Sequence, residues 1–184
     1  ATASFILDVL TAGEVVETTG WIETELADIT SEDEVVITMT KESTTWALYS
    51  GNGASEAPTA LVVTVFGGKI TSEVPDGYAW NISNDNGTLV IYPNGTTESW
   101  LYCIDSNNGV RVGNNDAKEF TIDATSGYLK HTTTNRYVGV YTTKPDWRCY
   151  TNTTGNTADQ TLKFYKEVLP AGAVIPPTIE GDVE

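Results

Sequence analysis

Tyr78-Ala79-Trp80-Asn81-Ile82 is a short apolar stretch that recurs in two further versions, Lys118-Glu119-Phe120-Thr121-Ile122 and Gln160-Thr161-Leu162-Lys163-Phe164. The central residues Trp80, Phe120 and Leu162 stand 40 and 42 positions apart, and each is followed by a second apolar residue two positions later. Side chains two positions apart along a strand lie on the same face, so each stretch is predicted to be a strand that buries this face. A period of about 40 residues indicates an architecture of repeated units.

Short strands separated by turns are predicted between these stretches. Each of three units opens with an apolar strand, continues with a strand led by an aromatic residue, adds a third strand and closes with one of the stretches. The opening strands are Val35–Met39, Leu89–Tyr92 and Tyr128–Lys130, the aromatic-led strands are Trp46–Tyr49, Trp100–Cys103 and Tyr137–Tyr141, and the third strands are Leu61–Phe66, Val110–Val112 and Trp147–Tyr150. Turn signals such as Asp76-Gly77 and Asn86-Gly87 separate strands, because these pairs adopt positive φ readily. The sequence therefore predicts an all-β domain over residues 34–168, with a β-sandwich as the competing arrangement.

Three repeats of about 40–50 residues with four strands each resemble the β-trefoil, in which strands close a small barrel and hairpins cap one end. Ricin-type trefoil lectins carry a Gln-x-Trp motif near the end of each repeat. Here Gln160-Thr161-Leu162 keeps the Gln and Tyr78-Ala79-Trp80 keeps the Trp. The resemblance implies a lectin-like fold with ligand binding as its function.

A second resemblance concerns residues 100–113, Tyr137–Tyr141 and Asp146–Tyr150. These segments are similar to modules of secreted and cell-surface proteins from gut Bacteroidetes, which accompany other domains and have no assigned activity. The resemblance implies a secreted or cell-surface location and linkage to further domains in the parent chain.

The charge distribution divides the chain and excludes some partners. The net charge is −15, and residues 1–34 hold nine acidic residues and no Lys or Arg. Nucleic acids and anionic membrane surfaces need clustered Lys and Arg, and no segment approaches the ~20 apolar residues of a membrane span. We therefore expect no nucleic acid and no membrane insertion. Residues 1–33 are expected to form an acidic N-terminal extension, either an added strand or an acidic arm, and residues 169–184 a C-terminal linker or tail.

The two cysteines allow two interpretations. Cys103 and Cys149 lie in strand-like segments without a CxxC spacing, so they are either two small buried apolar residues or, in an exported protein, a disulfide. With His131 as the single histidine, a zinc site is not expected. Hairpin turns explain the oxygen-rich segment Asp105–Gly109 without calcium, so neither a metal nor a cofactor is predicted.

No residue group predicts catalysis, because His131 is the single candidate base and no nucleophile elbow accompanies it. A ligand site is predicted in the third unit, where an aromatic floor and planar polar groups come together as in sugar sites. Its residues are Tyr141, Asp146, Trp147, Arg148 and His131. The alternative interpretation makes Trp147 and Tyr141 core or cap residues and Asp146–Arg148 a surface pair.

These observations predict a non-catalytic binding module of an exported protein, with a carbohydrate as the expected ligand. Two alternatives remain open. The module could bind a protein partner through the long segment 51–58, as trefoil inhibitors or adhesion domains do through an exposed loop, or it could be an accessory domain of a larger secreted enzyme.

Overall fold

A computed structural model describes residues 20–168, which form one compact unit. These residues fold into fifteen strands and a single short 3-10 turn at Leu26–Asp28. The strands are β1 (Gly20–Thr24), β2 (Val35–Lys41), β3 (Thr44–Leu48), β4 (Ala60–Val63), β5 (Val65–Phe66), β6 (Lys69–Ile70), β7 (Ala79–Asp85), β8 (Thr88–Pro93), β9 (Trp100–Cys103), β10 (Val110–Gly113), β11 (Glu119–Ile122), β12 (Leu129–His131), β13 (Tyr137–Tyr141), β14 (Asp146–Tyr150) and β15 (Thr161–Val168). The predicted all-β class is confirmed.

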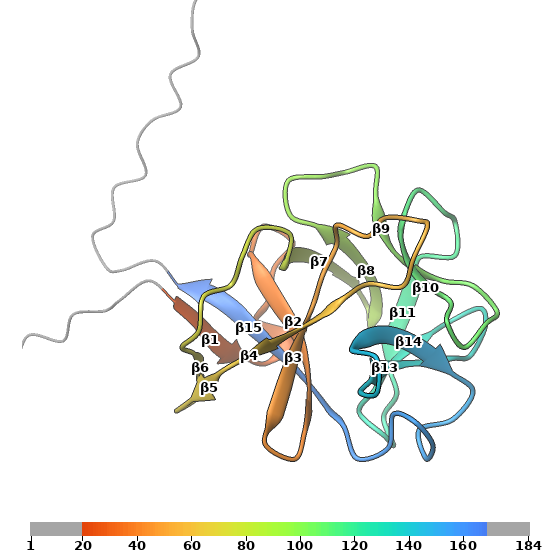
Figure 1. Ribbon diagram of the computed structural model, residues 1–184. Coiled ribbons are helices and arrows are strands. Elements are labelled where there is room, and N and C mark those ends of the chain that lie inside the picture. The colour runs from red at the N-terminus through yellow and green to blue at the C-terminus, as the bar shows by residue number, and fades with distance from the viewer. Residues whose placement is uncertain (1–19, 169–184) are drawn as a thin grey trace, which may run out of the picture. The chain divides into compact units, whose positions relative to one another are not determined.

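The strands pair in an antiparallel manner throughout this unit. Thirteen of them form one sheet in the order β14-β13-β12-β11-β8-β7-β2-β15-β1-β6-β5, with β3 paired to β2 and β4 paired to β3. Strands β9 and β10 form a separate hairpin. Figure 1 shows that β1 and β15 lie side by side although they come from opposite ends of the described chain, and their register runs from Gly20↔Val168 to Thr24↔Phe164.

The main core contains two of the three residues that carry the repeated pattern. Trp80 and Phe120 are fully buried, as expected for strands that bury one face. The prediction that Leu162 is buried like the other two is wrong, because this side chain is only partly buried and packs against the outside of the core. It lies near the start of β15, and the next residue on the same face, Phe164, occupies the core instead.

A second, smaller apolar cluster covers the opposite face of β2 and β15. It contains Val36 and Tyr165, which face away from the main core, and Ile70 of β6 closes over them. Strand β2 is consequently buried on both faces over its first five residues, which explains why Val35, Val36 and Ile37 are all apolar. The half-buried Trp21 of β1 packs against the edge of this cluster.

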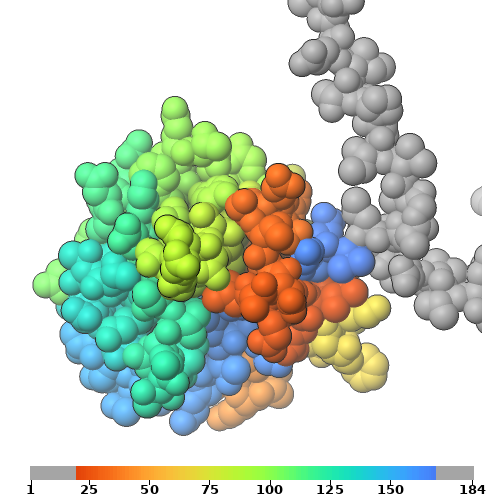
Figure 2. Space-filling view, turned by 180° about the vertical axis from the view of Figure 1, so that it is seen from behind, coloured from red at the N-terminus to blue at the C-terminus, as the bar shows by residue number. Residues whose placement is uncertain are grey.

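Residues 20–33 of the predicted N-terminal extension contribute strand β1 to the described unit. Residues 20–33 belong to the same compact unit as the rest, since β1 pairs with both β15 and β6 and Ile29 lies in the main core. In Figure 2 the red and orange N-terminal segment lies against the blue end of β15. Residues 1–19 and 169–184, including the remainder of the acidic extension and the predicted tail, lie outside the described residues.

Cys103 of β9 and Cys149 of β14 are joined in a disulfide. The bond links the β9–β10 hairpin to the β13–β14 hairpin, and both cysteines are fully buried. Between residues 20 and 168 the fold contains no helix of the length and apolarity that a membrane crossing requires.

Candidate binding cleft around Trp21

Trp147 does not form the exposed floor that the sequence predicts. Its side chain is fully buried in the main core, and its Nε1 donates a hydrogen bond of 3.2 Å to the carbonyl oxygen of Ala47. Alternate residues of a strand point to opposite faces, so Trp147 points inward while its neighbours Asp146 and Arg148 lie on the other face of β14. The ring is therefore not available for stacking on a ligand, and its role is structural.

His131 is likewise fully buried and cannot supply a hydrogen bond to a ligand at the surface. The backbone N–H of Thr134 donates to Nδ1 at 3.1 Å, so the proton lies on Nε2, which donates to the carbonyl oxygen of Ala117 at 2.9 Å. Burial lowers the pKa of His131. The imidazole is a neutral connector between two loops.

The structure brings together the remaining three predicted residues, Tyr141, Asp146 and Arg148. The Arg148 guanidinium forms hydrogen bonds of 2.6 and 3.0 Å to the two carboxylate oxygens of Asp146, and it lies 4.1 Å from the centre of the Tyr141 ring. Hydrogen bonding to Asp146 raises the pKa of Arg148. The three groups satisfy one another, so they form a stabilising cluster with little capacity left for a ligand.

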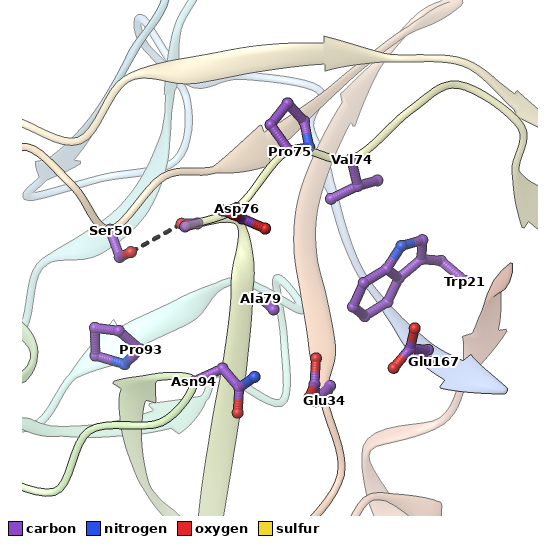
Figure 3. Close-up of a pocket in the computed structure, with 11 residues that line it drawn as sticks. Trp21, Glu34, Ser50, Val74, Pro75, Asp76, Ala79, Pro93, Asn94 and Glu167 are labelled. Atoms are coloured by element: carbon purple, nitrogen blue, oxygen red, sulfur yellow. Dashed lines mark hydrogen bonds between the residues drawn. The ribbon is translucent and has the colours of Figure 1, made fainter. Parts of the chain in front are cut away.

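A hollow of about 440 Å³ lies elsewhere, over the sheet beside the second apolar cluster. We call it the Trp21 cleft, and Figure 3 shows its side chains arranged around Ala79. The lining residues are Trp21, Glu34, Ser50, Val74, Pro75, Asp76, Gly77, Ala79, Pro93, Asn94 and Glu167. An aromatic ring thus stands in one hollow with three carboxylates, an amide and a hydroxyl.

Strand register explains why residues so distant in sequence converge here. Trp21 of β1 is directly opposite Glu167 of β15, and the Glu167 N–H donates to the carbonyl oxygen of Glu34, just before β2, at 2.9 Å. On the next strands, the Asn94 N–H donates to the carbonyl oxygen of Ala79 at 3.0 Å. The floor therefore crosses neighbouring strands, and the small Ala79 side chain leaves its centre open.

The loop at residues 74–77 forms the upper wall of the cleft and is fixed in place. Both the backbone N–H and the hydroxyl of Ser50 donate to the carbonyl oxygen of Gly77, at 2.9 and 2.8 Å. Gly77 has a φ of 87°, and a Cβ at this position would lie 2.7 Å from the ring of Tyr49. Because Tyr49 also packs on Tyr78 with ring centroids 4.9 Å apart, the wall is rigidly supported and requires glycine.

The cleft is negatively charged. Glu34, Asp76 and Glu167 line it, and none of its lining residues is basic. Two lysines of β15 pair with carboxylates outside the lining: Lys166 with Asp33 at 2.8 Å and Lys163 with Glu23 at 2.7 Å. Burial and the adjacent Glu34 carboxylate raise the pKa of Glu167.

These groups suit a ligand rich in hydroxyl groups. Carboxylate, amide and carbonyl oxygens accept hydrogen bonds from hydroxyls, while one face of an indole ring can contact the C–H groups of a sugar. Residues 20–168 contain no group of three or more His, Cys, Asp or Glu side chains arranged to hold a metal ion.

Trp21 lies within the predicted N-terminal extension, and no role is predicted for it from the sequence. One signal was present: Glu23 follows Trp21 by two positions and therefore lies on the same face, which indicates a Trp on a partly exposed face. The partners Glu34, Asn94 and Glu167 gave no such signal, because strand order alone brings them to Trp21.

A scan of the chain against protein-family models gives no match, and a search of curated proteins gives none either. The interpretation of the cleft therefore rests on its own geometry and charge.

Proposed function

We propose that this domain is a non-catalytic carbohydrate-binding module with a β-trefoil-like fold, and that it binds its glycan in the Trp21 cleft. The observation that carries the proposal is the half-buried Trp21 ring in a hollow lined by Glu34, Asp76, Asn94 and Glu167. An apolar surface with a few convergent polar groups is the usual composition of a small-ligand site.

The pattern of strand pairing supports a trefoil-like interpretation. Three hairpins, β3–β4, β9–β10 and β13–β14, recur at similar positions in the chain. The strands that flank them pair successively as β15-β2-β7-β8-β11-β12. The turn at Asn86-Gly87 and the turn before β12 at Gly127, both with positive φ, separate three segments of similar length. Such a pattern is expected for a repeat architecture.

An exported context is supported by the Cys103–Cys149 disulfide, because disulfides persist mainly in oxidising compartments. Secretion or display at the cell surface of a gut Bacteroidetes species, within a longer multidomain chain, remains the proposal that the sequence resemblance suggests. A glycan on a host, microbial or dietary surface would be accessible to such a module.

The test begins with a glycan array probed with the full chain, followed by titration of the hits. Trp21→Ala should abolish binding, and Ala79→Leu should weaken it strongly by filling the centre of the cleft while keeping Trp21. The control is Phe66→Ala, which removes an exposed aromatic side chain outside the cleft (79% exposed) and should leave affinity unchanged. Hits that survive both cleft variants in folded protein would refute the assignment of the site.

A catalytic role is tested with the same ligands. Two neighbouring carboxylates, one with a raised pKa, are also found in glycoside hydrolases, and here Glu34 and Glu167 are such neighbours. We expect no new reducing ends after incubation of the protein with the glycan. If the protein releases reducing ends and the Glu167→Gln variant does not, the proposed function changes from binding to hydrolysis.

The protein-partner alternative has one structural observation in its favour. The segment 51–58 is held at both ends, since the Val112 N–H donates to Gly53 and the Trp147 N–H donates to Pro58, while its centre at residues 54–56 is exposed. A rigid exposed loop suits recognition by a protein. A blank array, together with a partner whose binding is lost on Ser55→Arg, would favour this alternative.

A further inference from the structure

A second groove lies on the outer surface of β7 and β8. It has a volume of about 390 Å³ and is lined by Ser83, Val90, Tyr92, Thr97, Trp100 and Lys118. We call it the Trp100 groove. Alternation along β8 explains its apolar floor: Leu89 and Ile91 point into the main core, so Val90 and Tyr92 point outward and remain half-exposed.

The charge of this groove is opposite to that of the Trp21 cleft. Lys118 is its one charged lining residue, and none of the ion pairs within residues 20–168 involves Lys118. Its Nζ lies 3.8 Å from the centre of the Trp100 ring, a position that a cation–π interaction favours. Glu119 follows Lys118 in the chain and is exposed, but it does not line the groove.

A chain of hydrogen bonds fixes the loop that carries Lys118. The Trp100 Nε1 donates to the carbonyl oxygen of Asn115, and the Asn115 side-chain oxygen accepts from the Ala117 N–H at 2.9 Å. The Ala117 carbonyl in turn accepts from Nε2 of the buried His131 at 2.9 Å. The backbone on the N-terminal side of Lys118 is thus held by hydrogen bonds, and the ammonium group itself contacts the face of the Trp100 ring.

We infer that the Trp100 groove is a second binding site, which takes a saccharide bearing a carboxylate, such as a uronic-acid residue. The carboxylate pairs with the Lys118 ammonium, whose remaining N–H donors point away from the indole ring. The sugar ring lies along Tyr92 and Val90, and the hydroxyls of Ser83 and Thr97 supply hydrogen bonds at its edge. The protein has a net charge of −15, but the lining of this groove contains a lysine and no carboxylate. The groove therefore attracts an anionic ligand although the protein as a whole is negatively charged.

The inference does not rest on the Trp21 cleft. The two hollows share the outer face of β7 and β8 but have no lining residue in common. Their charges predict opposite preferences: the Trp21 cleft should disfavour an acidic sugar because of Glu34, Asp76 and Glu167, whereas the Trp100 groove should require one.

The experiment compares two matched probes by calorimetric titration of the full chain. One is a short oligosaccharide of uronic-acid residues, and the other is the same oligosaccharide after reduction of its carboxylates to primary alcohols. The acidic form should bind about tenfold or more tightly than the reduced form, because one charge-assisted hydrogen bond contributes enough for that ratio. Equal affinity for the two forms would overturn the inference.

Variants assign the effect to Lys118. Lys118→Gln should weaken binding of the acidic probe about tenfold, and Lys118→Arg should retain most of it. Lys144→Gln removes an equal charge from an exposed position outside the groove and should have no effect. If Lys118→Gln and Lys144→Gln reduce affinity equally, the ligand responds to net charge alone and the site is refuted.

A third probe shows whether the groove recognises an acidic sugar or any small carboxylate. Glutarate offers carboxylates without a sugar ring and should bind far more weakly than the oligosaccharide, since it cannot contact Tyr92 and Val90. Binding of glutarate as tight as that of the oligosaccharide would overturn the saccharide assignment. Loss of neutral-glycan binding in Trp21→Ala tests the proposed function separately, so failure at one site is distinguishable from failure at the other.

Discussion

Removal of the Cys103–Cys149 disulfide should lower the free energy of unfolding by about 4 kcal/mol. The two cysteines are 46 residues apart in sequence, and a crosslink that closes a loop of this length removes about 13 cal/mol/K of chain entropy from the unfolded state. At room temperature this entropy corresponds to about 4 kcal/mol. Because both residues are fully buried, replacing them with alanine also leaves small cavities, which adds to the loss.

Urea denaturation followed by tryptophan fluorescence measures the effect. Wild-type protein and a Cys103→Ala, Cys149→Ala double variant are compared with and without reductant. Reductant should shift the wild-type midpoint toward that of the variant and leave the variant unchanged. Two findings would refute the reasoning: identical wild-type midpoints under both conditions, or two titratable thiols in wild-type protein unfolded without reductant.

Two further predictions concern the core. Trp80→Ala should cost about 3–5 kcal/mol, since the ring is fully buried and its Nε1 donates to the carbonyl oxygen of Leu48 at 2.8 Å, whereas Phe66→Ala should be nearly neutral in the same urea melts. Burial lowers the pKa of His131, so below about pH 6.5 the unfolded chain binds a proton that the fold does not, and stability should fall as the pH drops from there. His131→Gln should remove this part of the pH dependence; an unchanged slope would show that His131 is not the cause. The comparison with the variant isolates His131 from Glu167, whose raised pKa acts in the opposite direction.

The all-β class was predictable because inward-facing strand residues are apolar and recur at every second position of the sequence. Trp80 and Phe120 are buried as the repeated pattern requires, and the turn at Asn86-Gly87 has the positive φ values that its sequence favours. An added strand was one of two alternatives for residues 1–33, but its position at residues 20–24 was not predicted, because Trp21 and Ile22 stand among acidic residues. What holds β1 in place is its pairing with β15, which lies at the other end of the described chain.

The binding residues were less accessible to sequence analysis than the core. Neither the Trp21 cleft nor the Trp100 groove comes from one contiguous segment, and strand order determines which outward-facing side chains meet. The predicted site, in contrast, contains the contiguous residues Asp146, Trp147 and Arg148. Adjacent residues of a strand point to opposite faces, so these three side chains cannot line one surface together. Tyr141 lies beside Arg148, but the Asp146 carboxylate already occupies the guanidinium.

For four of the five tryptophans, strand alternation separates residues of the core from residues at the surface. Trp46, Trp80 and Trp147 are each followed two positions later by Leu48, Ile82 and Cys149, and all six of these side chains are buried. The indoles of Trp80 and Trp147 also donate to consecutive carbonyls of β3, at Leu48 and Ala47, which ties the rings to the backbone of the core. Trp21 is followed at the same spacing by the charged Glu23 and stays half-buried. Trp100 is also half-buried although Tyr102, two positions later, is buried, so the residue on the same face indicates the exposure of Trp21 but not that of Trp100.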